Sequence, residues 1–265
     1  SGYGGLTILD KIRGLMPEYD YIYLGDSARC PYGPRSFEVV YEFTLQAVSK
    51  LFELGCPLVI LACNTASAKA LRTIQQINLP VIDATRRVLG VIRPTAECIG
   101  EITRSRHVGI LATAGTIKSE SYLLEIHKLS PDIVVTGEAC PMWVSLVENN
   151  EYQSEGADYF VKQHINRLLD KDPMIDTIIL GCTHYPLLLD KIRQFTPGHI
   201  RIIAQGEYVA RSLQDYLNRH PEMDARCEKG GKCRFLTTES ESKFEESASI
   251  FLGRQDIKVE SIALE

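Results

Sequence analysis

The sequence predicts an α/β fold with parallel sheets, divided into two related lobes that face one crevice. Short apolar runs alternate with amphipathic stretches along the whole chain, as expected of buried strands joined by crossover helices. In addition, one strand-end motif occurs once in each half of the chain. The 265 residues, 45% hydrophobic and 24% charged, suffice for two modest domains of ordinary composition.

The expected strands are short, rich in β-branched residues and bounded by turn residues. They are Tyr21–Leu24, Leu58–Ala62, Val81–Asp83, His107–Leu111, Ile133–Thr136, Ile175–Leu180 and Ile200–Ile203. Helical spacing is found over Phe37–Leu54, Ala66–Ile77, Ile117–Leu129, Tyr159–Leu169 and Leu187–Phe195. One more such unit closes the chain, formed by Arg234–Thr238, the helix-like Glu241–Leu252 and Ile257–Ile262. No Ser/Gly-rich linker marks a boundary, so a second lobe must be inserted or tightly packed.

Charge and composition exclude several classes of partner. The net charge is −5 with lysine and arginine dispersed, and phosphate binding needs a basic face, so we expect no nucleic-acid partner. The apolar run Leu58–Cys63 is far shorter than a membrane span of roughly 18 residues. The first twenty residues include the charged residues Asp10, Lys11, Arg13 and Glu18, so we expect no signal peptide in this sequence. Eight cysteines are too few for a disulfide scaffold, and we expect a reducing, cytoplasmic compartment.

The repeated motif places one cysteine after a strand in each half. The segment from Leu58 to Thr65 reads LVILACNT, and the segment from Thr177 to His184 reads TIILGCTH. Each is a buried strand followed by a small residue, a cysteine and polar groups. Ligands of open α/β sheets bind at the carboxyl ends of strands, so Cys63 and Cys182 are expected to face one crevice.

Two such thiols suit the binding and chemistry of a small anion. A helix N-terminus lowers a thiol pKa and binds anions, and Asn64, Thr65 and Thr183 add polar groups beside it. A buried structural cysteine is the simpler interpretation of either motif alone, but not of the pair. His184 could tune the Cys182 thiol or carry its proton. The other histidines have no matching acid in the sequence and are expected to be structural or exposed; they are His107, His127, His164, His199 and His220.

No metal or cofactor motif is evident. Five residues separate Cys227 from Cys233, a spacing unlike that of common zinc sites. The opening glycines, Gly2 to Gly5, lack the preceding strand and the third glycine of a dinucleotide fingerprint. The sequence therefore predicts a site that works without metal or cofactor.

Several segments of the chain resemble a known family. They are Ser1-Gly2-Tyr3-Gly4-Gly5, Leu24-Gly25-Asp26 with Pro31-Tyr32-Gly33, Ala62-Cys63-Asn64-Thr65-Ala66-Ser67, Ala112-Thr113-Ala114-Gly115-Thr116-Ile117, Cys140-Pro141, Gly181-Cys182-Thr183-His184-Tyr185-Pro186, and the ending from Phe235 to Gly253. In these segments the chain resembles the cofactor-independent aspartate/glutamate racemase superfamily, and within it the glutamate racemases, over nearly its whole length.

The resemblance implies two pseudo-symmetric three-layer lobes, formed by residues 1–90 with 205–265 and by residues 91–204. It also implies cofactor-independent interconversion of L- and D-glutamate, which supplies D-glutamate for peptidoglycan and so serves cell-wall biogenesis and cell shape. In the family one thiolate removes the α-proton and the opposite thiol protonates the other face. Cys63 matches the thiol that deprotonates D-glutamate, and Cys182 the one that deprotonates L-glutamate.

The family also implies which residues surround the substrate. They are Ser1, Tyr32, Gly33, Asn64, Thr65, Thr113, Thr116, Thr183 and His184. Glu148 matches an acidic residue near the second thiol. The implied partner is small-molecule glutamate, and a homodimer is the one protein assembly left open.

One departure concerns the start of the chain. In the family an aspartate stands immediately before the residue that matches Ser1, at the end of the first strand. The sequence begins at Ser1, so the first lobe is expected to lack this strand. We expect residues upstream of Ser1 to form it, next to the strand that ends at Cys63.

Three alternatives are left open. One is a sibling racemase or isomerase that acts on aspartate or another small acid. Another is a Cys–His hydrolase, which would form an acyl-enzyme and would have little use for the second cysteine. The third is a two-lobe protein that binds glutamate but is catalytically impaired.

Overall fold

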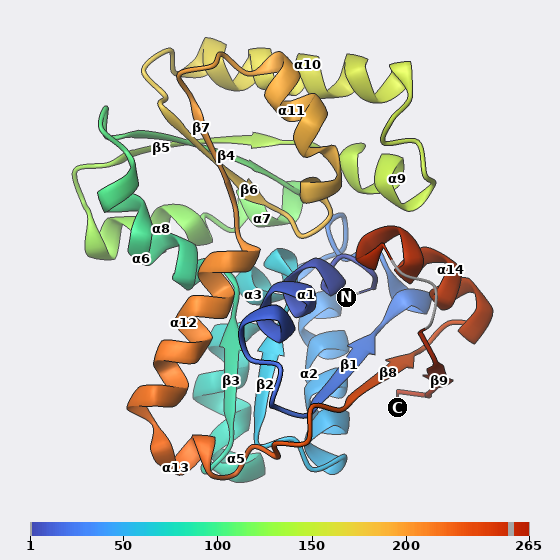
Figure 1. Cartoon of the computed structure of the whole chain (residues 1–265). Helices are drawn as coiled ribbons and strands as arrows, with labels where there is room; N and C mark the ends of the chain where they lie inside the picture. The colour runs from blue at the N-terminus through green and yellow to red at the C-terminus, as the bar shows by residue number, and fades with distance from the viewer. Residues whose placement is uncertain (1, 254–256, 265) are drawn as a thin grey trace.

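The predicted α/β fold with parallel strands is confirmed (Figure 1). The computed structural model describes residues 2–253 and 257–264. All strand pairs in this part of the chain are parallel. The strands form a four-stranded sheet, a three-stranded sheet and a two-stranded sheet.

The four-stranded sheet has the order β5-β4-β6-β7 and is buried on both faces. Its strands are β4 (His107–Ala112), β5 (Val134–Ala139), β6 (Thr177–Gly181) and β7 (Arg201–Ala204). Helices α10 (Glu155–Lys171) and α11 (Leu189–Phe195) cover one face, and α6 (Ile92–Ile102) and α8 (Ser121–Leu129) cover the other (Figure 1). Alternating residues of β6 serve the two cores: Ile178 packs with the first pair of helices and Ile179 with the second. Continuous apolar runs are what a doubly covered parallel strand requires.

The remaining strands form two smaller sheets. Strands β1 (Tyr21–Gly25), β8 (Cys233–Thr237) and β9 (Val259–Ser261) form one, and β2 (Leu58–Leu61) and β3 (Arg87–Gly90) form the other. Helices α1 (Leu6–Leu15) and α12 (Gly206–Arg219) pack on one side of β2, and α2 (Phe37–Glu53) packs on the other. Helix α14 (Glu241–Leu252) covers β1 and β8. Strands β1 and β2 do not pair with each other in the described ranges.

Short elements connect these layers. They are η1 (Ser27–Arg29), α3 (Asn64–Lys69), α4 (Leu71–Thr73), the π-helical η2 (Ile74–Asn78), α5 (Leu79–Asp83), α7 (Ala114–Lys118), α9 (Trp143–Glu148), η3 (Tyr185–Leu188) and α13 (Pro221–Asp224). The strands of the four-stranded sheet all fall within residues 91–204, and the others fall within 1–90 and 205–265. The two-lobe division of the sequence remains a prediction.

Three expected elements differ from the structure. Val81–Asp83 is not a strand but the end of helix α5. Pro80 stands at the start of this helix, where its fixed φ suits the first turn, and Val81 is 86% exposed, so burial gives no reason for a strand. The expected helix Ile117–Leu129 is two helices, because Glu120 adopts a left-handed conformation with φ +54° between them. The expected helix Ala66–Ile77 begins two residues earlier and continues through a short break into π-helix.

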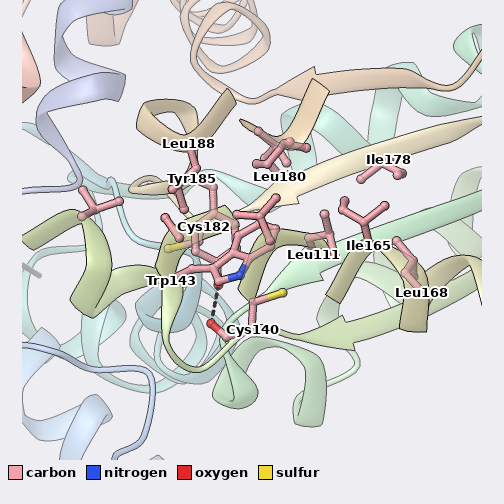
Figure 2. Packing of buried hydrophobic residues seen from close by; sticks show 14 of the residues in the cluster. Leu111, Cys140, Trp143, Ile165, Leu168, Ile178, Leu180, Cys182, Tyr185 and Leu188 are labelled. Atoms are coloured by element: carbon pink, nitrogen blue, oxygen red, sulfur yellow. Dashed lines mark hydrogen bonds between the residues drawn. The ribbon is translucent and has the colours of Figure 1, made fainter. Parts of the chain in front are cut away.

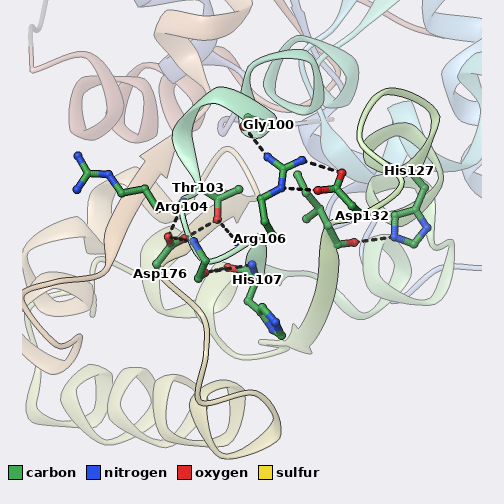
Figure 3. Close-up of polar contacts among 10 residues, drawn as sticks. Gly100, Thr103, Arg104, Arg106, His107, His127, Asp132 and Asp176 are labelled. Carbon is green, nitrogen blue, oxygen red and sulfur yellow. Dashed lines mark hydrogen bonds and ion pairs between the residues drawn. The ribbon is translucent and has the colours of Figure 1, made fainter.

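A polar cluster fixes the turn that leads into β4 (Figure 3). The Asp176 carboxylate accepts hydrogen bonds of 2.7 Å from the backbone N–H groups of Arg104 and Ser105 and from the Thr103 hydroxyl. Arg106, whose φ is +64°, pairs with Asp132 and donates to the Gly100 carbonyl. Because this cluster lies before the first residue of β4, it is at the amino edge of the sheet and away from the strand ends that carry the cysteines.

Candidate active site

Cys63 caps the helix that follows strand β2. Its sulfur accepts the backbone N–H of Ala66 at 3.4 Å, and Cys63 is the N-cap residue of α3. The side chain is buried, and the thiol is free. Strand β2 ends at Leu61, so the predicted order of strand, small residue, thiol and helix is present.

Cys182 follows strand β6 in the same way and contacts a histidine–carboxylate pair. Its sulfur lies 3.7 Å from His184 Nδ1, and His184 Nε2 lies 2.9 Å from Glu148 Oε1. Glu148 ends helix α9. The hydrogen bond at Nε2 orients the imidazole, so that Nδ1 faces the thiol. The three side chains form a relay that begins at Cys182 and leads outward to a partly exposed carboxylate.

Aromatic side chains pack in the same buried cluster as Cys182 and help to raise the pKa of its thiol (Figure 2). Trp143 and Tyr185 lie with ring centroids 4.8 Å apart, and the Tyr185 hydroxyl donates to the Cys140 carbonyl at 3.1 Å. Both rings are fully buried, in the same cluster as Cys182. Burial raises the pKa of the Cys182 thiol, although the backbone N–H of His184 works in the opposite direction. The protonated thiol is therefore the favoured form at neutral pH.

The two cysteines are close enough to interact. A charge on Cys63 further raises the pKa of Cys182. The glycine loop before α1 joins the two strand ends. A Cβ on Gly4 would lie 2.5 Å from His184 Nδ1, and a Cβ on Gly5 would lie 3.0 Å from the Ala62 carbonyl oxygen. Only glycine allows this approach, so the loop spans from the end of β2 to the histidine beside Cys182.

Three of the expected threonines form a hydroxyl cluster. Thr65, Thr113 and Thr116 have hydroxyl oxygens 3.0 to 3.4 Å apart, and Thr113 caps helix α7 through the backbone N–H of Thr116. Gly33 lies against Thr113, since a Cβ there would be 3.0 Å from the Thr113 Cβ. Thr65 lies just after the end of β2, and Thr113 and Thr116 lie just after the end of β4, so two strand ends contribute to a single group of hydroxyls.

Thr183 and Tyr32 are held differently. The Thr183 carbonyl accepts the Thr7 hydroxyl at 2.9 Å, which ties α1 to the second cysteine motif. The Tyr32 hydroxyl donates to the buried carboxylate of Asp26, which also accepts from Arg29 and Thr238. Burial and this carboxylate raise the pKa of Tyr32. Ser1 lies outside the described residues.

A cavity of about 480 Å³ reaches this site from between β1 and β2. Its lining includes residues of both strands and of helices α1 and α2, and it extends to Cys63, Asp26 and Tyr32. Its volume lies in the range of small-molecule sites. The middle of the lining is mostly aliphatic, and polar residues line the cavity near Cys63 and at the amino ends of β1 and β8, where Asp20, Lys232 and Arg234 lie.

The expectation that the other histidines lack acids is wrong for three of them. His107 pairs with Asp172 at 2.9 Å, His164 with Glu138 at 2.7 Å and His220 with Glu222 at 3.2 Å. The partners of His107 and His164 lie 65 and 26 residues away in the chain, so no short spacing could reveal them.

The sequence analysis assigned no role to several other residues beside the site. Asp26 directly follows β1, a strand-end position that could have marked it. The amide of Gln205 and the hydroxyl of Tyr122 contact Asn64 or each other, and Phe251 packs edge-on against His184. In the parts of the chain that the structure describes, no group of three or more metal-ligating side chains occurs, and no helix is long and apolar enough to cross a membrane.

Comparison with known proteins gives consistent matches over the whole chain. Residues 7–213 match the Asp/Glu/Hydantoin racemase family. A glutamate racemase of Listeria monocytogenes is 39% identical over 265 residues, covering 100% of this chain and 96% of the relative. The structure of a glutamate racemase from Bacillus anthracis superimposes with a TM-score of 0.90 at 35% identity, covering 100% and 95% of the two chains. The structure of a glutamate racemase from Francisella tularensis in complex with D-glutamate superimposes with a TM-score of 0.88 at 30% identity, with the same coverage of the two chains.

Proposed function

The chain belongs to the Asp/Glu/Hydantoin racemase family and is an amino-acid racemase of the glutamate racemase type, and from this premise we propose how it works. It interconverts L- and D-glutamate without a cofactor, by proton transfer between the α-carbon and two thiols. The product D-glutamate supplies peptidoglycan synthesis in the cytoplasm. The two lobes of the sequence prediction, residues 1–90 with 205–265 and residues 91–204, meet at this site.

The observation that carries the proposal is the pair of thiols at equivalent strand ends. Cys63 follows β2 and Cys182 follows β6, both are buried, and a charge on Cys63 raises the pKa of Cys182. A single nucleophilic thiol would need only one of these motifs. Two thiols on opposite faces of a planar carbanion are what inversion at the α-carbon requires. We expect the sulfurs to lie roughly 6–8 Å apart around the substrate, each about 3–3.5 Å from Cα.

The proton balance is simple. In the L-to-D direction the Cys182 thiolate takes the α-proton, and the Cys63 thiol donates its own proton to the opposite face. The enzyme then holds its proton on the other sulfur, and the reverse reaction starts from that state. Two thiolates across a small ligand would repel, so one shared proton is favoured. His184, 3.7 Å from Cys182, can take the thiol proton when the substrate enters.

The substrate carboxylate is the second requirement. The carbanion has no imine to delocalise its charge, so donors that are already oriented toward the carboxylate must stabilise it. We propose that Asn64, the hydroxyls of Thr65, Thr113 and Thr116, and the backbone beside Thr183 supply these donors. Ser1, Tyr32 and Gly33 complete the set that the resemblance implied.

Incubation with each glutamate enantiomer in D₂O, without added cofactor, tests the function. Deuterium at Cα together with loss of optical rotation supports racemisation. Exchange with neither enantiomer would contradict it and leave a glutamate-binding protein. Exchange of aspartate at a higher kcat/KM would assign the protein to the sibling racemases, and a covalent adduct in the mass spectrum would indicate a hydrolase.

Single serine variants test the two-base assignment. Because enantiomers have equal free energy, kcat/KM must fall equally in both directions for Cys63→Ser and for Cys182→Ser. The asymmetry should instead appear with α-deuterated substrates. Cys182→Ser should raise the isotope effect on L-glutamate, and Cys63→Ser that on D-glutamate. Wild-type turnover in both directions for either variant would exclude that cysteine as a base.

A further inference from the structure

We propose that Gln205 and Tyr122 are positioning residues that hold the Asn64 amide in a single orientation beside Cys63. The inference rests on the proposed function, in which Asn64 contacts the substrate carboxylate. The three side chains form a closed ring of hydrogen bonds in the interior of the protein. They come from separate parts of the fold: Asn64 begins α3, Tyr122 lies in α8, and Gln205 follows β7.

The ring runs in one direction. The Tyr122 hydroxyl donates to Asn64 Oδ1 at 2.7 Å, Asn64 Nδ2 donates to Gln205 Oε1 at 2.6 Å, and Gln205 Nε2 donates back to the Tyr122 hydroxyl at 2.5 Å. Gln205 Nε2 also donates to the Val91 carbonyl at 3.0 Å. Every oxygen in the ring accepts and every nitrogen donates, so the ring is satisfied in this arrangement.

The ring fixes the orientation of the Asn64 amide. If that amide were turned over, its oxygen would face the Gln205 oxygen and its NH₂ group would face the hydroxyl proton of Tyr122. Two contacts would become repulsive in a region where Asn64, Tyr122 and Gln205 are only 2–3% exposed. Unsatisfied buried polar groups are costly. The observed orientation leaves one Nδ2 proton of Asn64 with no acceptor among the described residues, available to a carboxylate.

Tyr122 also touches the second cysteine motif. A Cβ on Gly181, the residue before Cys182, would lie 3.1 Å from Tyr122 Cε2, so the ring of Tyr122 occupies the space beside that strand end. Burial raises the pKa of Tyr122, and a charge on Cys182 raises it further. The tyrosine therefore spans from the end of β6 to Asn64, and it couples the position of the amide to both strand ends.

Tyr122→Phe removes only the hydroxyl, and Gln205→Leu removes only the amide. We expect each to lower kcat/KM for both enantiomers by about tenfold, through a higher KM together with a lower kcat, because Asn64 would donate to the substrate carboxylate in the ground state and to the carboxylate of the carbanion in the transition state. Tyr41→Phe is the matched control. It removes a hydroxyl that donates to the Asn78 side chain at 2.9 Å, away from the cysteines, and its KM should equal that of the wild type.

A double-mutant cycle with Asn64→Ala separates positioning from stability. If Tyr122 acts through Asn64, Tyr122→Phe in the Asn64→Ala background should raise KM no further. An additive rise in KM would overturn the proposal, and so would wild-type KM values in folded Tyr122→Phe and Gln205→Leu. Failure of the wild type to racemise glutamate would instead refute the proposed function. Circular dichroism of every variant at the assay temperature shows that the compared proteins are folded.

Discussion

Replacing Glu148 tests the relay that begins at Cys182. Glu148 accepts from His184 at 2.9 Å, and His184 Nδ1 lies 3.7 Å from the Cys182 sulfur. In Glu148→Gln the side chain keeps its shape but loses its charge, so a charge-assisted hydrogen bond becomes a neutral one. In Glu148→Ala the bond is lost and His184 Nε2, on a side chain that is 7% exposed, is left without it.

The strength of the hydrogen bond between Glu148 and His184 sets the size of the expected fall in kcat. Hydrogen bonds to charged groups contribute about 1.5–3 kcal/mol, and neutral ones about 0.5–1.5 kcal/mol. The difference, about 1 kcal/mol, corresponds to roughly a fivefold fall in kcat for Glu148→Gln. Glu148 keeps a 20% exposed side chain, so water screens part of the charge and a larger effect is not expected. Full loss of the bond in Glu148→Ala should reduce kcat by about 10- to 100-fold.

The assay is racemisation of both enantiomers at a temperature where each variant is folded. Glu138→Gln is the matched control, since Glu138 pairs with buried His164 at 2.7 Å but touches neither reactive thiol. It should lower the melting temperature and leave kcat within about twofold. If Glu148→Gln and Glu148→Ala had the same kcat as the wild type, or if Glu138→Gln lost as much activity, the relay would have no role in catalysis.

Two further predictions follow from individual groups. Burial raises the pKa of Cys182, so the rate at which iodoacetamide alkylates this thiol should rise from pH 7 to pH 9 without levelling off. Peptide mass spectrometry measures the rate, and a plateau below pH 8 would contradict the prediction. Asp176→Asn should lower the free energy of unfolding in urea by about 1–3 kcal/mol, whereas Asp132→Asn, which only loses an exposed ion pair, should change it little. Although burial opposes it, hydrogen bonds from Thr103 and neighbouring backbone hold the pKa of Asp176 well below its usual range. The ionised Asp176 carboxylate therefore stabilises the folded protein above about pH 4, and this stabilisation is lost as the pH falls further. If Asp176→Asn unfolded at the same acid pH as the wild type, this contribution of Asp176 would be excluded.

Much of the sheet structure could be predicted because its residues are locally distinctive. After their first residues, His107 and Thr177, the runs that form β4 and β6 contain only apolar residues and glycine, as burial on both faces demands. The segment Val81–Asp83 has a similar composition but is exposed helix. Composition alone cannot separate an apolar run buried in a sheet from one that faces solvent, since the difference lies in what packs against it.

Site residues that directly follow a strand could be predicted from the sequence. Residues that reach the site only through tertiary contacts could not. Cys63, Cys182 and His184 belong to motifs that end strands, so their positions could be inferred. Gln205 contacts Asn64 across 141 residues of sequence, and Asp172 contacts His107 across 65. Such pairings are decided by how the layers pack, and no periodicity in a single sequence records them.

The pairing of β1 with β8 bears on how the protein is made. Tyr21 pairs with Cys233, so β1 leaves the ribosome more than 200 residues before its partner strand. Strands β4 to β7 come from one continuous stretch and can form their sheet as soon as Ala204 has emerged. Phe251, which packs against His184, is made later still. The nascent chain therefore holds a finished sheet and an unfinished one together. Throughout that interval strand β1 lacks its partner strand, and apolar segments exposed in this way are the ones that promote aggregation.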